Sequence, residues 1–339
     1  MIREQIEHNE EMLLSPYAVR ASQTKGRSIP EVEDPYRTCF QRDRDRILHS
    51  KCFRRLKHKT QVFISPEGDH YRTRLTHTLE VGQIARTIAR ALRLNEDLTE
   101  AMAMGHDVGH TPFGHAGEHI LQKIMPGFHH AQESVRMLSI VESRARTPHV
   151  AGLNLTWEVL DGIANHSGSN QAATLEGRIL KFADRIAYVN HDIDDSIRAG
   201  VLREEDLPKE CVEILGKNSS ERISALVHAV VHASMDQPEI RMEEPYQGAL
   251  RELRGFMFDR VYTNEMIKGE NRKLEHIITD LFQYLLEHPE AMPADHHIIY
   301  EDREDSPEMK VMDYISGMTD DFLIRTYREL FIPKVWSIL

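Results

Sequence analysis

The chain has 339 residues, 40% of them hydrophobic, which is enough to bury the core of one large domain or of two small ones. Its formal net charge of −12 excludes a generally basic coat for nucleic acid or for an anionic membrane surface, so an anionic ligand requires a local pocket. The N-terminus is polar, and no apolar run reaches the roughly 18 residues that a membrane span needs, so no membrane contact is expected. The three cysteines lack metal-ligand spacing, which predicts reduced thiols and a cytoplasmic protein.

In chain order, the polar, proline-bearing segment from Ser15 to Pro35 comes first and predicts a loop. Apolar residues then recur at helical spacing over 75–92, 175–193 and 274–285, and each stretch predicts an amphipathic helix. The acidic segment from Pro289 to Pro307 predicts a surface excursion. No two alternating strands joined by a two-residue turn are visible, so an all-α fold is expected.

The simplest organisation is one all-α domain over residues 1–339, because no linker, internal repeat or low-complexity tract divides the chain. Within it we expect a metal-binding core at about residues 50–200 and a helical C-terminal part at about residues 201–339.

The densest chemical signal lies between Gly105 and Glu118, where histidines and acids alternate with glycines. His106 and Asp107 follow an apolar segment, and the last turn of a helix can direct two neighbouring side chains at one cation. Mixed nitrogen and oxygen ligands suit Mn, Fe, Co, Ni or Zn better than Ca, and Mg is also a candidate. This segment therefore predicts a divalent metal site.

Two further ligands can come from other helices. His77 opens an amphipathic segment, and Asp184 lies inside an apolar run, where an unpaired carboxylate would be costly to bury. Two histidines and two carboxylates leave positions open for water and a phosphoryl oxygen, as metal-assisted hydrolysis requires. Other His-Asp neighbours, at 191–192 and 295–297, are interpreted as structural or surface groups.

Four blocks of the chain carry a family resemblance. They are Phe53–Phe63, Gly68–His77, Gly105–Glu118 and Asp313–Asp320. Together they resemble the HD-domain phosphohydrolases, and within them the deoxynucleoside triphosphate triphosphohydrolases, from about residue 35 to about residue 330. The resemblance implies an all-α HD fold with a C-terminal helical extension.

The resemblance also implies roles for individual residues. The metal ligands would be His77, His106, Asp107 and Asp184, and the catalytic group would comprise His110, His115, Glu118 and His130. Pro112 can occupy the first turn of a helix, which places His115 and Glu118 on one face, so that Glu118 can orient the imidazole. Ala131 and Glu133 depart from the Asn and Gln frequent in the family, so the choice between His129 and His130 stays open.

Substrate contacts follow from the same resemblance. Asp184, Tyr188 and Asp192 form one helix stripe, with Tyr188 expected at a phosphate and Asp192 at a sugar hydroxyl. Basic positions facing the triphosphate are expected at Arg55, Arg74, Lys181, Arg185 and Arg254. Around the deoxyribose we expect Gln61, Val62 and Tyr262.

The activity implied is hydrolysis of a deoxynucleoside triphosphate, dGTP or dNTPs in general, to deoxynucleoside and inorganic triphosphate. One alternative is an HD phosphohydrolase acting on monophosphates or signalling nucleotides. Another is a non-catalytic nucleotide sensor or single-strand nucleic-acid binder, using a local basic patch between Arg42 and Lys59. A nucleotide effector and a homo-oligomeric assembly are further expectations from the family.

Overall fold

The computed structural model describes residues 1–61, 72–142, 152–262 and 265–333, with the side chains at 262–268 and 271 excepted. Within these ranges the chain is helical and contains no strand, as the sequence predicts. The helices are α1 (Ile2–Leu13), α2 (Cys39–Leu48), α3 (Lys51–Arg55), α4 (Arg74–Ala91), α5 (Glu96–Gly105), α6 (Gly114–Ile124), α7 (His130–Arg136), α8 (Trp157–Ala164), α9 (Leu175–Arg198), α10 (Lys209–Leu215), α11 (Ser219–Ser234), α12 (Glu244–Met257), α13 (Glu265–Glu287), α14 (Ala294–Ile298), α15 (Pro307–Ser316) and α16 (Asp320–Phe331).

Side-chain caps determine where the helices around the site begin. Thr73 accepts a hydrogen bond from the backbone N–H of Thr76 at the start of α4, and Thr174 does the same for Gly177 at the start of α9. Asn95 caps α5, whose first turn also carries two acids that favour the positive end of the helix. The three helices that meet at the site are therefore anchored at their N-termini by local sequence.

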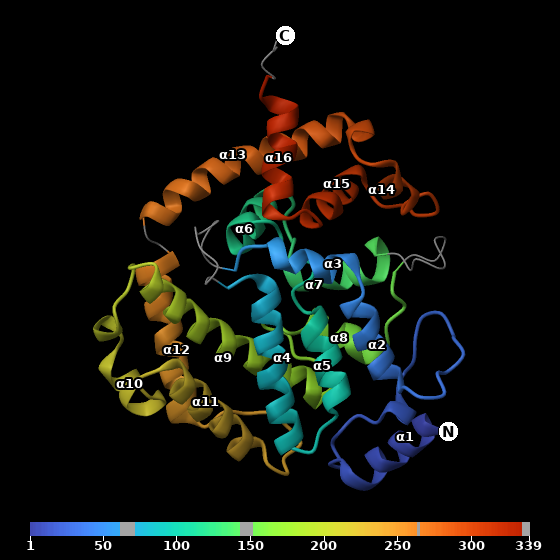
Figure 1. Cartoon of the computed structure of the whole chain (residues 1–339), viewed down its shortest axis with the longest axis vertical. Coiled ribbons are helices and arrows are strands. Elements are labelled where there is room, and N and C mark those ends of the chain that lie inside the picture. Colours follow the sequence, from blue (N-terminus) through green and yellow to red (C-terminus); the bar gives the residue numbers. More distant parts are fainter. Residues whose placement is uncertain (62–71, 143–151, 263–264, 334–339) are drawn as a thin grey trace, which may run out of the picture.

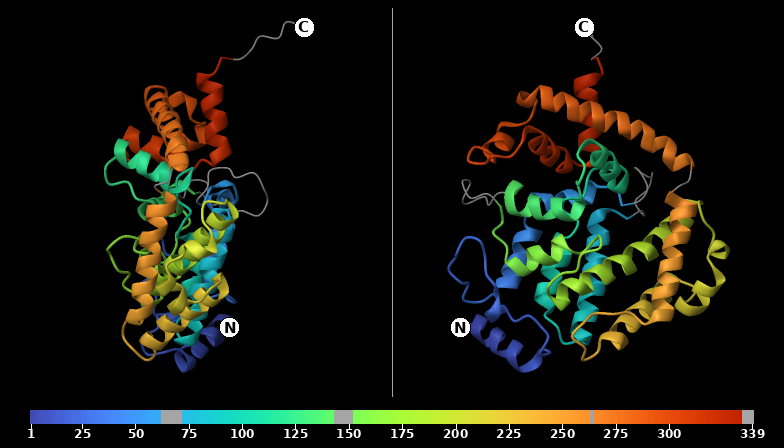
Figure 2. Two further views of the ribbon diagram at one scale, coloured as in Figure 1. Left: turned by 90° about the vertical axis from the view of Figure 1, so that its left-hand side faces the viewer. Right: turned by 180° about the vertical axis from the view of Figure 1, so that it is seen from behind.

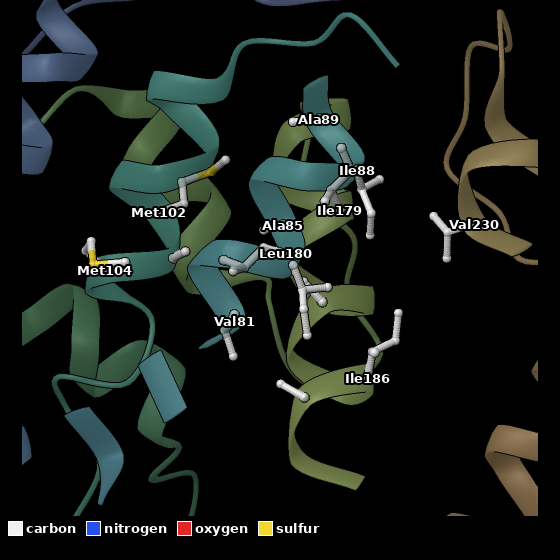
Figure 3. Close-up of a cluster of buried hydrophobic side chains, with 14 of the residues drawn as sticks. Val81, Ala85, Ile88, Ala89, Met102, Met104, Ile179, Leu180, Ile186 and Val230 are labelled. Atoms are coloured by element: carbon white, nitrogen blue, oxygen red, sulfur yellow. The ribbon is translucent and has the colours of Figure 1, made fainter. Parts of the chain in front are cut away.

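A large apolar cluster holds α4, α5 and α9 together (Figure 3). Val81 and Ile88 of α4, Met102 of α5, and Ile179 and Ile186 of α9 are all fully buried in it. Helices α8, α11 and α12 also contribute to this cluster. The result is a rigid frame beneath the ends of α4 and α5.

A second apolar cluster lies beneath helices α13–α16, which we call the C-terminal layer. Figures 1 and 2 show this layer crossing one end of the molecule, above α3, α6 and α7. In this cluster, Phe113, which directly precedes α6, and Leu121 of α6 pack with apolar residues of the layer. These include Leu281 of α13, Ile315 of α15 and Leu323 of α16. The layer therefore covers the segment that follows His106 and Asp107.

Two expectations about local structure need correction. Helix α6 begins at Gly114 and not at Pro112, because Phe113 adopts a left-handed conformation (φ 62°) that no helix can continue through. The segment from Pro289 to Pro307 is only partly a surface excursion, since it contains α14 and buries Met292 and Tyr300 in the C-terminal layer. The predicted loop from Ser15 to Pro35 is confirmed apart from one 3₁₀ turn. In the described part of the chain, no helix has the length and hydropathy of a membrane span.

Candidate metal centre

Three helices bring the four expected metal ligands to one point. His77 lies in the first turn of α4, His106 and Asp107 follow directly after α5, and Asp184 lies in the middle of α9. The Nε2 atom of His77 lies 3.2 Å from Asp184 Oδ1 and 3.8 Å from Asp107 Oδ2. The Nε2 atom of His106 lies 3.6 Å from Asp107 Oδ1 and 3.9 Å from Asp184 Oδ1. The candidate donor atoms of His77, His106 and Asp107 all lie within 4.8 Å of one another, which is close enough for them to bind one cation.

The tautomer of His106 suits a metal ligand. Its Nδ1 lies 2.7 Å from the carbonyl oxygen of Ala103, which can only accept a hydrogen bond, so Nδ1 carries the proton. The lone pair is then on Nε2, which is buried and has no hydrogen-bond partner. A buried acceptor without a donor is costly, and a cation at this position would satisfy it.

The two carboxyl groups are kept ionised. Burial disfavours the charge on Asp107, yet His106 and Arg74 outweigh burial and hold its pKa well below the usual value. Burial likewise opposes ionisation of Asp184, while the hydrogen bond to His77 and the neighbouring imidazoles lower its pKa. Two anionic oxygens and two imidazole nitrogens fit a divalent cation.

Glu118 holds two histidines at once, one on each carboxylate oxygen. Its Oε2 lies 3.2 Å from His115 Nδ1, and its Oε1 lies 2.9 Å from both the Nδ1 and the backbone nitrogen of His130. Burial would raise the pKa of Glu118, but hydrogen bonds from these two histidines lower it far below the usual value. The imidazole of His115 is 76% exposed, so it reaches the open side of the site.

His110 completes this cluster from the inside. Its ring stacks on His130 with centroids 4.5 Å apart, and burial holds its pKa well below the usual value for histidine. Gly109 permits the position of His110, since a Cβ there would lie 2.1 Å from the backbone nitrogen of Ser134. The four expected catalytic side chains therefore lie together beside the metal ligands.

Arg74 and Gln61 lie against the same centre, as expected for substrate contacts. Arg74 is buried and donates from Nη1 to Asp107 Oδ2 at 2.5 Å, while its Nη2 and Nε have no partner. Gln61 is buried with its Oε1 also unpartnered. Gly114 lies between them, where a Cβ would approach Arg74 Nη2 to 2.9 Å. These unused polar groups are available to a ligand.

Besides Arg74, a second set of basic side chains lies along α9 and α12. The Arg254 guanidinium lies 6.0 Å from the ring centroid of Tyr188, and both burial and Arg254 lower the pKa of Arg185. Burial raises the pKa of Tyr188 to about 12, so its hydroxyl stays protonated and can donate. Asp192 is buried one turn further along α9, and Lys181 lies one turn before Arg185 with its Nζ bonded to the Asn170 carbonyl at 2.7 Å.

Three expected substrate residues are placed differently or not described. Arg55 lines a cavity of about 820 Å³ together with Tyr314 and Phe322 of the C-terminal layer, and it is not part of either basic group at the metal centre. Val62 lies outside the described residues. The side chain of Tyr262 also lies outside them, although its backbone closes a π turn that follows α12.

The sequence analysis missed His166 as a member of the site. It follows α8, is buried, and its ring centroid lies 5.0 Å from that of His106. Its Nδ1 lies 2.7 Å from the Ile163 carbonyl oxygen, three residues earlier, which is the same bond that orients His106. The signal that could have found it is this shared placement of a histidine directly after a buried apolar helix.

Lys59 was also missed, because its basic neighbourhood suggests a surface patch. Its Nζ donates to the carbonyl oxygens of His110, at 2.5 Å, and Ser316, at 2.7 Å. Burial and the nearby Arg55 lower its pKa to about 7. Only part of the expected basic patch is taken up by internal contacts, since Lys59 is buried and Arg42 and Arg46 both pair with Glu31, whereas Lys51, Arg54 and Lys57 are exposed.

The histidines interpreted as structural lie in two places. His191 is buried beside the metal centre, with its ring 5.9 Å from that of His77 and its Nε2 3.0 Å from Glu80 Oε2. It is thus closer to the site than the sequence suggested. His296 and His297 lie in the C-terminal layer, where each ring bonds a backbone carbonyl.

Comparison with known families places these residues in matched segments. Residues 74–189 match the HD domain family, and residues 240–329 match the phosphohydrolase-associated domain family. The first match includes all four expected metal ligands, and the second includes most of the C-terminal layer.

Curated relatives are similar over nearly the whole chain. A deoxyguanosinetriphosphate triphosphohydrolase-like protein of Caldanaerobacter subterraneus subsp. tengcongensis is 51% identical, with 99% of this chain and 97% of that protein covered. The Clostridium tetani protein with the same description is 47% identical, with 98% and 97% covered. Among solved structures, a phosphohydrolase from Bacteroides thetaiotaomicron is 19% identical with a TM-score of 0.50, covering 84% of this chain and 67% of that one, and it supports the fold.

Proposed function

The chain belongs to the family of deoxyguanosinetriphosphate triphosphohydrolase-like HD-domain proteins, and from this premise we propose that it hydrolyses deoxynucleoside triphosphates to deoxynucleoside and inorganic triphosphate. The observation that carries the proposal is the convergence of His77, His106, Asp107 and Asp184 beside a separate histidine pair held by Glu118. This arrangement combines a cation site with a proton-transfer group, which phosphoester hydrolysis needs.

The four convergent side chains would hold a divalent cation. When bound, such a cation polarises a phosphoryl oxygen or lowers the pKa of water. Arg74 contributes next to it, because its two unpartnered nitrogens are buried donors at the edge of the ligand set. Those donors would bind non-bridging phosphate oxygens and neutralise charge that develops there.

His115 is the group best placed to move a proton. Glu118 accepts from Nδ1, so Nε2 of the exposed ring is free to give a proton to the leaving 5′-oxygen or to take one from the attacking water. His110 and His130 pack behind it and fix the position of Glu118.

The distal phosphates would lie along α9. Lys181, Arg185 and Arg254 supply positive charge there, and the protonated hydroxyl of Tyr188 adds a neutral donor. A triphosphate requires several such donors, and phosphoryl transfer depends largely on positioning and electrostatics. Asp192 remains our candidate for a sugar hydroxyl contact, and Gln61, Val62 and Tyr262 remain our candidates for enclosing the deoxyribose.

The test is incubation of the purified protein with each of the four dNTPs and with Mn²⁺, Mg²⁺ or Co²⁺, followed by chromatography. We expect equimolar deoxynucleoside and inorganic triphosphate, and at least roughly tenfold lower kcat/KM on the matching ribonucleotide, since an unsatisfied buried hydroxyl costs about 1–3 kcal/mol. The Asp184→Ala variant is the inactive control. Turnover of a monophosphate in the absence of dNTP cleavage would favour the alternative HD phosphohydrolase.

Three expectations about context remain predictions. A nucleotide effector, a homo-oligomer and a cytoplasmic location all come from the sequence and its family resemblance. The nucleic-acid-binding alternative is less favoured, because three arginines of the candidate basic segment, Arg42, Arg44 and Arg46, already pair with acids.

A further inference from the structure

A buried carboxyl group lies against a second one where α7 meets the C-terminal layer. Glu133 of α7 is 4% exposed, and its Oε1 atom is buried without a hydrogen-bond partner. A side-chain hydrogen bond joins Glu133 to Asp313 of α15, whose side chain is fully buried. Two carboxyl groups in contact repel each other strongly when both are ionised, so the pair needs a proton.

The other hydrogen bonds of Asp313 show which of the two carries the charge. Arg136 donates from Nε to Asp313 Oδ1 at 2.5 Å and from Nη2 to Oδ2 at 2.7 Å. The hydroxyl of Tyr300, which follows α14, donates to Oδ2 at 2.5 Å, and burial raises the pKa of Tyr300, so this hydroxyl stays protonated. Both oxygens of Asp313 therefore accept, as an ionised carboxylate does. The proton of the pair then belongs to Glu133.

The two cations near Glu133 are bonded elsewhere. Arg136 also donates to Asp305, at 2.8 Å, so one guanidinium already serves two carboxylates. Lys59, which follows α3, directs its ammonium group at two backbone carbonyl oxygens. Burial and the charge of Asp313 outweigh Arg136 and Lys59, and they raise the pKa of Glu133 well above the usual value. A neutral Glu133 is therefore the form that fits these contacts.

We propose that Glu133 is a positioning residue, which keeps its proton in the folded protein and donates it to Asp313, so that α7 is fixed against the C-terminal layer. Helix α7 begins at His130, whose ring and backbone nitrogen both bond Glu118. Ionisation of Glu133 would place a second anion against Asp313 and loosen α7, and with it the carboxylate that orients His115. This effect on catalysis rests on the proposed function, whereas the protonation of Glu133 does not.

The first measurement is urea denaturation between pH 5 and pH 7. An unfolded glutamate loses its proton at about pH 4.5, whereas the folded protein keeps the proton on Glu133, so stability should fall as pH rises. Glu133→Gln supplies a neutral donor of the same shape and should remove this dependence. The folding equilibrium constant of the unmodified protein, divided by that of the variant, should fall by up to about tenfold per pH unit. Glu301→Gln, at an exposed position between α14 and α15, is the control and should keep the slope of the unmodified protein.

Two further readouts separate protonation from a general loss of structure. Infrared spectra at pH 7 should show the carbonyl stretch of a protonated carboxyl group in the unmodified protein, and Glu133→Gln should lack this contribution. With dNTP and Mn²⁺, the ratio of the kcat of Glu133→Gln to that of the unmodified protein should rise from pH 7 toward alkaline pH. The reason is that only the unmodified protein loses the contact with Asp313 by ionisation.

Parallel pH slopes in Glu133→Gln and the unmodified protein, or identical infrared spectra in the carboxyl region, would overturn the proposal. A slope of the opposite sign would mean that Glu133 is ionised and paired with Arg136 or Lys59. Failure of Glu133→Gln to fold by circular dichroism would also contradict the proposal, because its amide keeps a donor in the same place. Denaturation and infrared spectra require no nucleotide, so a lack of dNTP cleavage would refute the proposed function and leave the protonation of Glu133 standing.

Discussion

Single hydrogen bonds decide which imidazole nitrogens are available in this site. His106 and His166 each donate from Nδ1 to the carbonyl three residues earlier, and His115 and His130 each donate to Glu118. In all four cases the remaining Nε2 is directed into the site or toward solvent. The same residue type can therefore act as a metal ligand or as a proton carrier, according to what surrounds Nε2.

At this scale we predict the effect of removing the exposed imidazole. His115→Ala should lower kcat by roughly 10²–10⁴-fold, the usual loss for a general acid or base, because no other exposed histidine lies on Glu118. Metal content should be unchanged, since His115 is not one of the converging ligands. His119→Ala, one turn later on the exposed face of α6, is the matched control and should keep full activity. Unchanged turnover in His115→Ala would remove this residue from the mechanism.

At the scale of elements, the C-terminal layer holds the loop that leads from Asp107 to α6. Asp320, at the start of α16, accepts from the backbone N–H groups of Phe113 and Thr60, each at 2.9 Å. Lys59 joins the carbonyl oxygens of His110 and Ser316, at the end of α15. Arg136 of α7 binds Asp313 of α15 through two nitrogens. These contacts connect residues between 177 and 260 positions apart in the sequence, so the layer is part of the support of the site.

The buried ammonium of Lys59 predicts a pH-dependent stability. Its pKa is lowered to about 7 in the folded state from 10.5, so the unfolded chain binds more protons between those values. The contribution of Lys59 to the free energy of unfolding should therefore rise with pH between about 7 and about 10.5, and should be least favourable and constant below about pH 7. Lys59→Met should abolish this slope.

The measurement is urea denaturation at several values from pH 7 to pH 10. The advantage of the unmodified protein over Lys59→Met should grow with pH. The exposed neighbour gives the control, because Lys57→Met should parallel the unmodified protein at every pH. A constant difference between the unmodified protein and Lys59→Met would mean that Lys59 does not titrate in this window.

At the scale of the whole molecule, the metal ligands join helices that are distant in sequence. His77, His106 and Asp184 lie on or directly after α4, α5 and α9, so a cation at their centre would link three elements of the main apolar cluster. In a chain with a net charge of −12, it would also relieve repulsion between Asp107 and Asp184. Binding should therefore stabilise the fold as a whole.

The corresponding prediction concerns thermal unfolding. Free Mn²⁺ at about 100 times its Kd should add about 2.7 kcal/mol to the free energy of unfolding, and a chelator should remove that gain. Asp184→Ala should lose most of the shift in Tm, whereas His297→Ala, in the C-terminal layer, should keep it. An equal Mn²⁺-dependent shift in Asp184→Ala would exclude this carboxylate from the cation site.

The sequence by itself determined the all-α class, because helical periodicity and capping residues act within a few positions of one another. It also predicted that certain residues between positions 74 and 118 should meet Asp184 at one metal site, since each of them lies on a strong helix or directly after one. Only the tertiary structure decided where Lys59, His166 and Arg55 lie and which groups they contact. Burial, the orientation of a ring nitrogen and the choice of a carbonyl partner depend on which helices pack together, and no local pattern specifies that packing.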